Sequence, residues 1–216
     1  MLAALETSRQ EQQRLVRDAG HELRTPLTAL RTNIELLGRT PGLTDEQRSE
    51  LISAADAEVK DLSSLVGEVV DLASDRYTEG PTEDLLLDET VASCVERAIR
   101  RFDVEIRLDA GPSSIQGRPA ALSRAVDNLL DNAVKWGADA GPIDVEVAGG
   151  RVVVRDHGPG IDAVDRGRVF DRFYRSATAR AMPGSGLGLS IVKQVVDAHG
   201  GEVFVEPAEG GGAIVG

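Results

Sequence analysis

The sequence is poor in the residues that several common classes of protein depend on. Of its 216 residues only one is cysteine, and 3% are aromatic. The single cysteine, Cys94, excludes an intrachain disulfide, and its apolar neighbours Val91 and Val95 favour a small residue inside a helix over a reactive thiol. Because aromatic residues are scarce, the core has to be built from leucine, valine, isoleucine and alanine.

Long apolar runs and an excess of positive charge are also missing. The sequence has no run of about 18 apolar residues, so we expect no segment of it to span a membrane. No charged-then-apolar secretory leader opens the chain. Lysine and arginine number 24 against 36 aspartates and glutamates, which gives a formal net charge of -12. Nucleic-acid binding is therefore not expected, because it needs an electropositive face.

The first 75 residues are expected to form a helical hairpin. The segment Thr40–Asp45 has turn chemistry, and either Thr44 or Asp45 is placed to cap a second helix. Apolar residues on both sides of it follow heptad-like spacing, which is typical of helices packed in bundles. A stripe this wide predicts dimerisation into a four-helix bundle. The apolar positions are Val16, Leu23, Leu27, Leu30, Ile34 and Leu37, then Leu51, Ala55, Leu62, Val66, Val69 and Ala73.

Residues 83–216 alternate between strand-like and helical patterns, which predicts a separate α+β domain. A polar stretch containing Gly and Pro, residues 76–82, is expected to link it to the hairpin. Gly149-Gly150 lies between two alternating runs and predicts a hairpin turn. The expected strands are Leu85–Leu87, Val104–Leu108, Ile143–Val147, Val152–Val154 and Val203–Val205, and the expected helices are Val91–Arg101, Pro119–Trp136 and Leu187–His199.

The hexapeptide His21-Glu-Leu-Arg-Thr-Pro26 lies on the first expected helix. Residues three and four apart share a helix face, so His21 lies near Arg24 and Thr25. It falls at the edge of the apolar seam, beside Gly20 and Leu23, where an exposed imidazole can act as a nucleophile. Arg24 is placed to offset phosphoryl charge, and Thr25 is placed to orient a water molecule.

Two neighbours of His21 have less direct roles. Glu22 is the candidate base, although adjacent helical residues point about 100° apart and direct contact would need a particular pair of rotamers. Pro26 removes the backbone donor that would bond to the carbonyl of Glu22, which predicts a kink just past the histidine.

His21-Glu-Leu-Arg-Thr-Pro26 matches the phosphoacceptor box of sensor histidine kinases, and Val16–Leu37 resembles the dimerisation helix of that family. A lone surface histidine would more often have no role, and it is the complete box that carries the resemblance. The sequence from Asp18 to Thr28, together with a short lid later in the chain, most resembles that of actinobacterial kinases of the MprB type. The family implies that Met1–Gln13 ends a signalling segment, and that a sensor region preceding this cytoplasmic portion anchors it in the bacterial inner membrane.

The resemblance also implies an ATP-binding domain with a histidine-kinase/gyrase-type α/β sandwich, and its sequence boxes follow in order. Asn128 and Asn132 are one helical turn apart, so both side-chain oxygens face one way. A neutral oxygen suits Mg²⁺, which takes few protein ligands beside phosphates. We expect Asn132 to bind Mg²⁺, with Asn128 as a second candidate ligand. Lys135 lies on nearly the same face and can reach a phosphate.

The box Asp156-His-Gly-Pro-Gly160 follows an expected strand. Asp156 can accept a hydrogen bond from the amino group of adenine, which guanine does not offer there. Gly158 and Gly160 let the backbone approach a ligand closely. The family usually has asparagine where His157 stands, and we interpret His157 as a tolerated substitution rather than a second phosphoacceptor.

The remaining boxes surround a short lid. The segment Gly184-Ser-Gly186-Leu187-Gly188 leads into a helix, a typical phosphate site. Val169–Arg175 resembles the phenylalanine box, within which Arg172, Tyr174 and Arg175 are candidate nucleotide contacts, and Ser176–Met182 resembles the lid. Gly211-Gly212 fits the last glycine box. Gly216 stands where the family adds a closing strand, so we expect a truncated C-terminal strand.

These features predict a homodimeric, ATP-dependent protein-histidine kinase that phosphorylates His21 and passes the phosphoryl group to an aspartate of a response regulator receiver domain. Thr25 with Glu22 suggests phosphatase activity toward that regulator, and the stretch Ser74–Pro81 is expected to act as a hinge. The alternatives are a stand-alone ATPase or switch of the gyrase/MutL type, a dimeric scaffold that binds ATP without transfer, and a coiled-coil adaptor with an unrelated domain. Whether transfer runs within a subunit or across the dimer stays open at this stage.

Overall fold

A computed structural model describes residues 2–40, 42–73, 81–179, 182 and 184–216. The chain forms two compact units, Met1–Ser74 with Ala177–Ser185, and Asp75–Ser176 with Gly186–Gly216. Most of the expected linker and hinge falls on residues 74–80, outside the described residues. Among the described helices, none combines the length and the apolar character needed to cross a bilayer.

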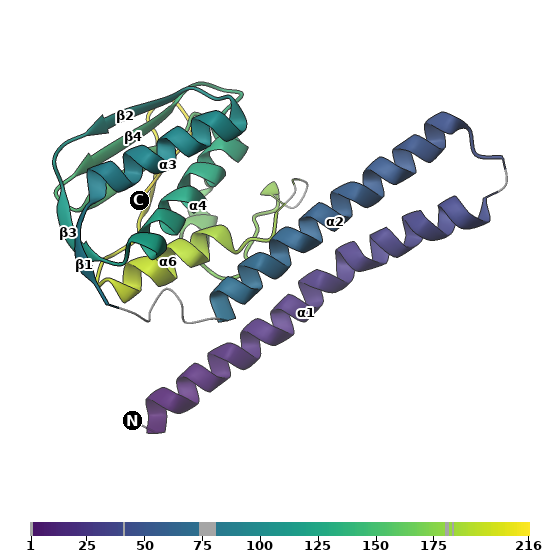
Figure 1. The fold of residues 1–216 in the computed structure, drawn as a ribbon, viewed down its shortest axis with the longest axis horizontal. Coiled ribbons are helices and arrows are strands. Elements are labelled where there is room, and N and C mark those ends of the chain that lie inside the picture. The colour runs from purple at the N-terminus through teal and green to yellow at the C-terminus, as the bar shows by residue number, and fades with distance from the viewer. Residues whose placement is uncertain (1, 41, 74–80, 180–181, 183) are drawn as a thin grey trace. The chain divides into compact units, whose positions relative to one another are not determined.

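The first unit is the expected helical hairpin, made of α1 (Leu2–Arg39) and α2 (Asp45–Ala73), which run antiparallel in Figure 1. The start of α2 is fixed by a capping box. The amide of Gln47 donates to Oγ1 of Thr44 at 3.2 Å, and the amide of Thr44 donates to Oε1 of Gln47 at 3.1 Å. This reciprocal pair satisfies two backbone donors that the first turn leaves without helical partners. Thr44, rather than Asp45, is therefore the cap.

The heptad seam of the hairpin divides between two faces. Leu23, Leu30 and Leu37 are half-buried, whereas Leu27 and Ile34 from the same seam are 57% and 56% exposed. Near His21, Ala19 is buried and Gly20 is exposed. The residues that face the partner helix of the hairpin are therefore Ala19 and Leu23, rather than Gly20 and Leu23. The exposed large apolar residues are Val16, Leu27, Ile34 and Leu36 on α1, and Ile52, Val59, Val66 and Val70 on α2.

The second unit is a two-layer sandwich with three long helices on one face of a mixed sheet (Figure 1). The sheet order is β2-β4-β5-β7-β6; β2 and β4 are parallel, and every other neighbouring pair is antiparallel. A separate ribbon pairs β1 with β3. The strands are β1 (Glu83–Leu86), β2 (Ile106–Ala110), β3 (Ser114–Gly117), β4 (Ile143–Ala148), β5 (Arg151–Arg155), β6 (Val205–Pro207) and β7 (Ala213–Val215). The helices are α3 (Leu87–Phe102), α4 (Pro119–Gly137), α5 (Ala163–Arg166) and α6 (Gly188–Ala198).

The expected elements of this domain are largely confirmed. The turn at Gly149 and Gly150 joins β4 to β5 with φ of 58° and 81°, and positive φ at both residues is typical of a type I′ hairpin turn. Several boundaries differ from the expected ones by one to four residues. The largest difference is at Leu87, which begins α3 instead of ending a strand, and β2 and β6 start at Ile106 and Val205 rather than at Val104 and Val203. The short elements β3, β7 and α5 had no clear periodic signal.

The core of the sandwich is aliphatic, as the scarcity of aromatic residues requires. Leu130 of α4, Ile143 and Val145 of β4, and Ile191 of α6 are among its most fully buried side chains. Phe102 and Phe170 are only partly buried and pack against the edge of the core. Burial of each of these aliphatic side chains contributes about 1.5–3 kcal/mol to the stability of the folded state. The sandwich therefore has a hydrophobic core of its own.

Candidate functional site

The candidate phosphoacceptor lies on α1 with its neighbours turned to solvent. His21, Glu22, Arg24 and Thr25 are all exposed, which confirms the expectation that the imidazole is not buried in the seam. No hydrogen bond or ion pair joins these four side chains to one another in the described part of the chain. The roles expected for Glu22, Arg24 and Thr25 stay predictions.

The backbone that follows His21 lacks one regular helical bond and carries a second perturbation. Pro26 lies inside α1 and cannot donate to the carbonyl of Glu22. The hydroxyl of Thr28 donates to the carbonyl of Arg24 at 2.8 Å, a side-chain bond that often bends helices. The helix is nevertheless continuous through Pro26. These two features favour bending just past the phosphoacceptor.

On the sandwich, α4 presents the two asparagines of the expected Mg²⁺ site. The carboxamide nitrogen of Asn128 donates to the carbonyl of Arg124 at 2.8 Å, which fixes the side chain and directs Oδ1 away from its own backbone. That oxygen lies 3.0 Å from the point where a Cβ of Gly188 would lie, so a larger residue at the start of α6 would crowd it. Asn132, one turn later, is half-buried. The structure thus brings Asn128 and the glycine-rich segment together.

The other nucleotide residues on or near α4 occupy defined places. The ammonium of Lys135 lies 5.1 Å from the ring centroid of Trp136, a cation–π distance. Leu187, expected as a nucleotide contact, is fully buried immediately before α6, and its role as a contact stays a prediction. No group of three or more His, Cys, Asp or Glu side chains in the described residues is arranged for a metal ion. The assignment of Asn132 and Asn128 to Mg²⁺ stays a prediction.

Asp156 is the most constrained polar residue of the site. It follows β5 directly and is 4% exposed. Its Oδ1 accepts hydrogen bonds from the amides of Gly158 at 2.9 Å and Ala213 at 3.2 Å. No described residue forms a hydrogen bond with Oδ2. One carboxylate oxygen thus holds the side chain in place, and the other is left to accept a hydrogen bond from a ligand.

The glycines around Asp156 allow backbone to pack on backbone. A Cβ on Gly212 would overlap the carbonyl of Asp156, and one on Gly158 would overlap the carbonyl of Trp136 at the end of α4. Gly160 has φ of 75°, and its Cβ would lie 2.8 Å from the carbonyl oxygen of Gly212. Gly158 and Gly160 were expected to let the backbone approach a ligand. The structure adds that they seat the Asp156 loop against α4 and against the turn before β7.

The base of the expected lid is a strained turn. Phe173 has φ of 60°, a left-handed conformation that bulky residues rarely adopt, and its amide donates to the carbonyl of Gly186 at 3.0 Å. The Tyr174 hydroxyl donates to Asp165 at 2.5 Å, and the guanidinium of Arg168 lies 4.3 Å from the Tyr174 ring centroid. Tyr174 is thereby tied to the adjacent α5 segment. Its role as a nucleotide contact stays a prediction.

The remaining candidates lie around this turn. Arg172 is exposed, and the side chain of Arg175 approaches Gly186. Gly184 has φ of 132°, which favours glycine. Part of the expected lid, residues 180–181, lies outside the described residues. His157 packs on Gly141, and its Nδ1 lies 2.9 Å from the carbonyl oxygen of Pro142, a structural contact consistent with a tolerated substitution.

Sequence reasoning missed two contributors to the site. The amide of Ala213, on the unanticipated strand β7, is one of the two donors to Asp156. Gly137, the last residue of α4, would place a Cβ 2.6 Å from the Cβ of Asp156. A glycine that ends an otherwise regular helix was the only available signal, and it also fits an ordinary helix terminus.

Comparison with known proteins follows the same division of the chain. Residues 11–77 match the family model for the "His Kinase A (phospho-acceptor) domain", and residues 117–215 match that for the "Histidine kinase-, DNA gyrase B-, and HSP90-like ATPase". The signal transduction histidine-protein kinase/phosphatase MprB of Mycobacterium avium (strain 104) is 48% identical over 223 residues. That alignment covers 98% of this chain and 43% of the relative, so the chain spans less than half the length of that relative.

Solved structures give similar matches. The mycobacterial sensor histidine kinase MprB has a TM-score of 0.56 at 39% identity, covering 62% of this chain and 93% of that one. Full-length ShkA in complex with AMPPNP has a TM-score of 0.58 at 27% identity, covering 94% of this chain and 44% of that one.

Proposed function

The chain belongs to the sensor histidine kinases, and we propose that it is a catalytic core that uses ATP to phosphorylate its own His21. The observation that carries this proposal is the pairing of two features in one chain. An exposed histidine box lies on a helical hairpin. A separate sandwich holds a buried carboxylate with one unoccupied oxygen, and in the same sandwich Asn128 faces the glycine-rich start of α6.

Asp156 supports selection of adenine over guanine. Its Oδ1 is held by two backbone amides, so Oδ2 is presented in a fixed direction. A carboxylate oxygen accepts hydrogen bonds, and the 6-amino group of adenine donates one, whereas guanine has a carbonyl oxygen at that position. A buried carboxylate facing that carbonyl would be left without a partner, which disfavours guanine.

The phosphates are proposed to lie between α4 and the start of α6. Asn128 already faces Gly188 across that boundary, and the amides at the beginning of α6 are ready donors for phosphate oxygens. We assign Asn132, with Asn128 as a second candidate, to Mg²⁺, and Lys135, Arg172 and Arg175 to phosphate charge. Bound Mg²⁺ would offset the negative charge of the triphosphate.

The transfer step requires few groups on the hairpin. A ring nitrogen of His21 attacks the γ-phosphorus, the bond from that phosphorus to the bridging oxygen breaks, and ADP leaves. The proton lost by the imidazole passes to Glu22 or to water. Arg24, one turn from His21, offsets the charge of the phosphohistidine. The nucleotide must reach His21, so we propose that the linker, whose residues 74–80 lie outside the described residues, acts as a hinge.

The partners follow from the same assignment. The exposed apolar stripe on α1 and α2 supports a homodimer that completes a four-helix bundle. The phosphoryl group is then passed to an aspartate of a response regulator receiver domain. The name of the M. avium relative includes a phosphatase activity, and Thr25, exposed near His21, is placed to orient a hydrolytic water. We also propose that an N-terminal sensor region anchors the whole protein in the inner membrane.

Labelling with [γ-³²P]ATP tests the assignment. His21→Gln should abolish acid-labile label while leaving ATP affinity unchanged, because the nucleotide residues lie on the other unit. His157→Asn is the matched control and should retain label. Label on His21→Gln protein at the wild-type level would overturn the phosphoacceptor assignment. Asn132→Ala should lose label through lost Mg·ATP binding.

The same experiment separates the kinase from a stand-alone ATPase. An ATPase of the gyrase type would release inorganic phosphate without acid-labile protein label, and release would not depend on His21. Mixed dimers of His21→Gln and Asn132→Ala subunits give the direction of transfer. Label in the mixture indicates transfer across the dimer, and loss of label in mixtures that do form dimers indicates transfer within a subunit.

A further inference from the structure

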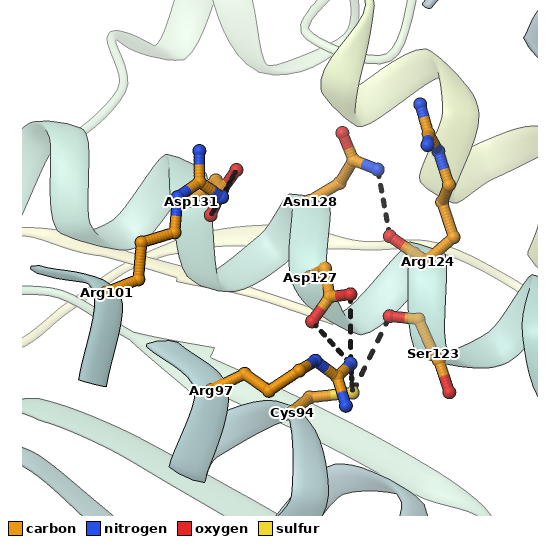
Figure 2. Close-up of polar contacts among 8 residues, drawn as sticks. All are labelled: Cys94, Arg97, Arg101, Ser123, Arg124, Asp127, Asn128 and Asp131. Atoms are coloured by element: carbon orange, nitrogen blue, oxygen red, sulfur yellow. Dashed lines mark hydrogen bonds and ion pairs between the residues drawn. The ribbon is translucent and has the colours of Figure 1, made fainter. Parts of the chain in front are cut away.

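Helix α4 carries two kinds of polar residue in the same repeat. Asp127 and Asp131 are four residues apart, and so are Asn128 and Asn132. Adjacent residues on a helix point about 100° apart, so the carboxylates form one face and the carboxamides form the next. Figure 2 shows Asp127 and Asn128 pointing to different sides of α4, with Asn128 directed away from α3. The direction of the asparagines therefore depends on how α4 is rotated.

The carboxylate face is joined to α3 by two ion pairs. Nη2 of Arg97 lies 3.0 Å from both carboxylate oxygens of Asp127, and Nη1 of Arg101 lies 3.3 and 3.5 Å from those of Asp131 (Figure 2). The two arginines are also one helical turn apart. The pairs thus form two rungs between the helices, and turning or sliding α4 would stretch both together.

Arg97 is held in place from a second direction. Its Nη2 also donates to Sγ of Cys94 at 3.1 Å, and that thiol lies 3.6 Å from the carbonyl oxygen of Ser123 on α4. Burial, with Asp127 adding to its effect, raises the pKa of Cys94 to about 11, so the sulfur stays a neutral thiol at physiological pH.

The apolar contacts beneath the rungs fix the distance between α3 and α4 more strongly than their register. Val91, Val95 and Ala98 of α3 pack in the same core as Val126 and Leu130 of α4. Hydrophobic contact is not directional, whereas a hydrogen bond weakens steeply when its angle changes. Exposed ion pairs contribute little to stability, and all four rung side chains are more than two-fifths exposed. A role in register accounts for the rungs better than a role in stability.

The register of α4 matters because Asn128 has little room. Its Oδ1 lies 3.0 Å from the Cβ position of Gly188, at the start of α6. A site that binds a metal–phosphate complex has to be held within about 0.5 Å of its productive geometry. A modest rotation of α4 would move both asparagines relative to the α6 amides.

From this arrangement we infer that the pairs Arg97–Asp127 and Arg101–Asp131 are positioning residues that set the rotation of α4 and so aim Asn128 and Asn132 at the phosphates. The inference rests on the proposed nucleotide-binding function. These four residues do not contact the ligand themselves. Their loss is expected to weaken the part of nucleotide binding that depends on Mg²⁺, and to leave the adenine contact intact.

The test compares Arg97→Gln, Arg101→Gln and the double variant with Arg100→Gln in the full chain. Arg100 pairs with Glu96 at 3.5 Å within α3 and does not reach α4, so Arg100→Gln removes an exposed pair without loosening the rungs. Dissociation constants are measured for ATP with Mg²⁺ and for ATP with EDTA. Melting temperature is measured for the protein without nucleotide.

The double variant is expected to weaken Mg·ATP binding about three- to thirtyfold, with a smaller loss for ATP in EDTA, so the benefit of Mg²⁺ shrinks. Its melting temperature should match that of Arg100→Gln. The charge swap Arg101→Asp with Asp131→Arg should recover most of the Mg²⁺ benefit that Arg101→Asp alone loses.

Two results would overturn the inference. One is wild-type Mg·ATP affinity in the double variant, and the other is an affinity loss equal with and without Mg²⁺ and accompanied by a lower melting temperature, which would indicate general loosening of the fold. Asp156→Asn separates this failure from failure of the proposed function. If Asp156→Asn binds ATP as the wild type does, the nucleotide site itself is wrong; if only Asp156→Asn is impaired, the positioning role alone is wrong.

Discussion

The hairpin and the sandwich solve the problem of burying apolar surface in different ways. The sandwich closes a continuous aliphatic core between α3, α4, α6 and the sheet. In the described part of the hairpin, Ala19, Leu65 and Leu72 are the buried apolar residues, while Val16 and Ile34 are 65% and 56% exposed. The sandwich is therefore complete as a single chain, whereas the hairpin has the surface of half a bundle. In the proposed function, this difference separates the unit that binds nucleotide from the unit that dimerises.

Glycine-to-alanine substitutions in the two units should give the largest difference between them. Gly212→Ala should destabilise the sandwich by more than about 4 kcal/mol, because the added methyl group overlaps the carbonyl of Asp156. The expected result is loss of the sandwich unfolding transition and of ATP binding. Gly67→Ala in α2, where nothing beyond the adjacent residues and the helix's own backbone lies within 4 Å of the new Cβ, should instead stabilise by about 0.5–1 kcal/mol through helix propensity. Equal melting curves for the two variants would contradict the close packing around Asp156.

The exposed stripe predicts a large effect that is confined to the hairpin. Ile34→Glu should convert the proposed dimer to monomer in analytical ultracentrifugation, because a charge placed in an apolar interface costs about 3 kcal/mol without a partner. The unfolding free energy of the sandwich should change by less than about 0.5 kcal/mol. Arg31→Ala, on the same helix at a polar position, is the control and should leave the dimer intact. A dimer that survives Ile34→Glu would place the interface elsewhere.

Cys94 provides a pH test of how tightly the sandwich is closed. Burial raises its pKa to about 11, above the ordinary value of 9.0, so the folded state holds the thiol proton more firmly than the unfolded state. The stabilisation is complete below pH 9 and is lost as the pH rises toward 11, by about 2 kcal/mol. Urea unfolding of wild type against Cys94→Ala isolates this term from other alkaline titrations. A wild-type curve parallel to that of the variant would mean that the thiol is reached by water.

The capping box of the hairpin gives the smallest effect. Thr44→Ala removes the acceptor for the amide of Gln47 and should cost about 1 kcal/mol, with the loss confined to the start of α2. Hydrogen exchange at the amide of Gln47 should accelerate. Ser63→Ala is the matched control, because the Ser63 hydroxyl bonds only to the carbonyl of Val59 inside the helix and caps nothing. Unchanged exchange in Thr44→Ala would show that the helix start is fixed by other contacts.

Local patterns were enough to predict much of the fold. The extent of α4 from Pro119, the turn at Gly149-Gly150 and the cap near Thr44 depend on residues close in sequence, and the structure has all three. The exposure of His21 followed from its place beside the seam. The seam itself was less informative, because spacing alone does not tell which apolar residues face the partner helix and which face outward, as Leu27 shows.

The features that the sequence did not reveal join distant residues. Strand β7 is three residues long and is defined by its pairing with β5 and β6, so no periodicity marks it. The bond from Ala213 to Asp156 spans 57 residues, and the rungs between α3 and α4 each span 30. An arginine on an amphipathic helix usually marks only a solvated face, and its partner appears only when the two helices are packed together.

The position of β7 inside the sheet also fixes when the protein can first bind nucleotide as it is synthesised. Val215 and Ile214 pair with Val154 and Arg155, and Ala213 supplies a donor to Asp156. The hairpin is made first and can fold while the sandwich is still being translated. The proposed adenine contact of Asp156 cannot be completed until residues 213–215 have left the ribosome. We expect stalled chains that lack those residues to form the hairpin and fail to retain ATP.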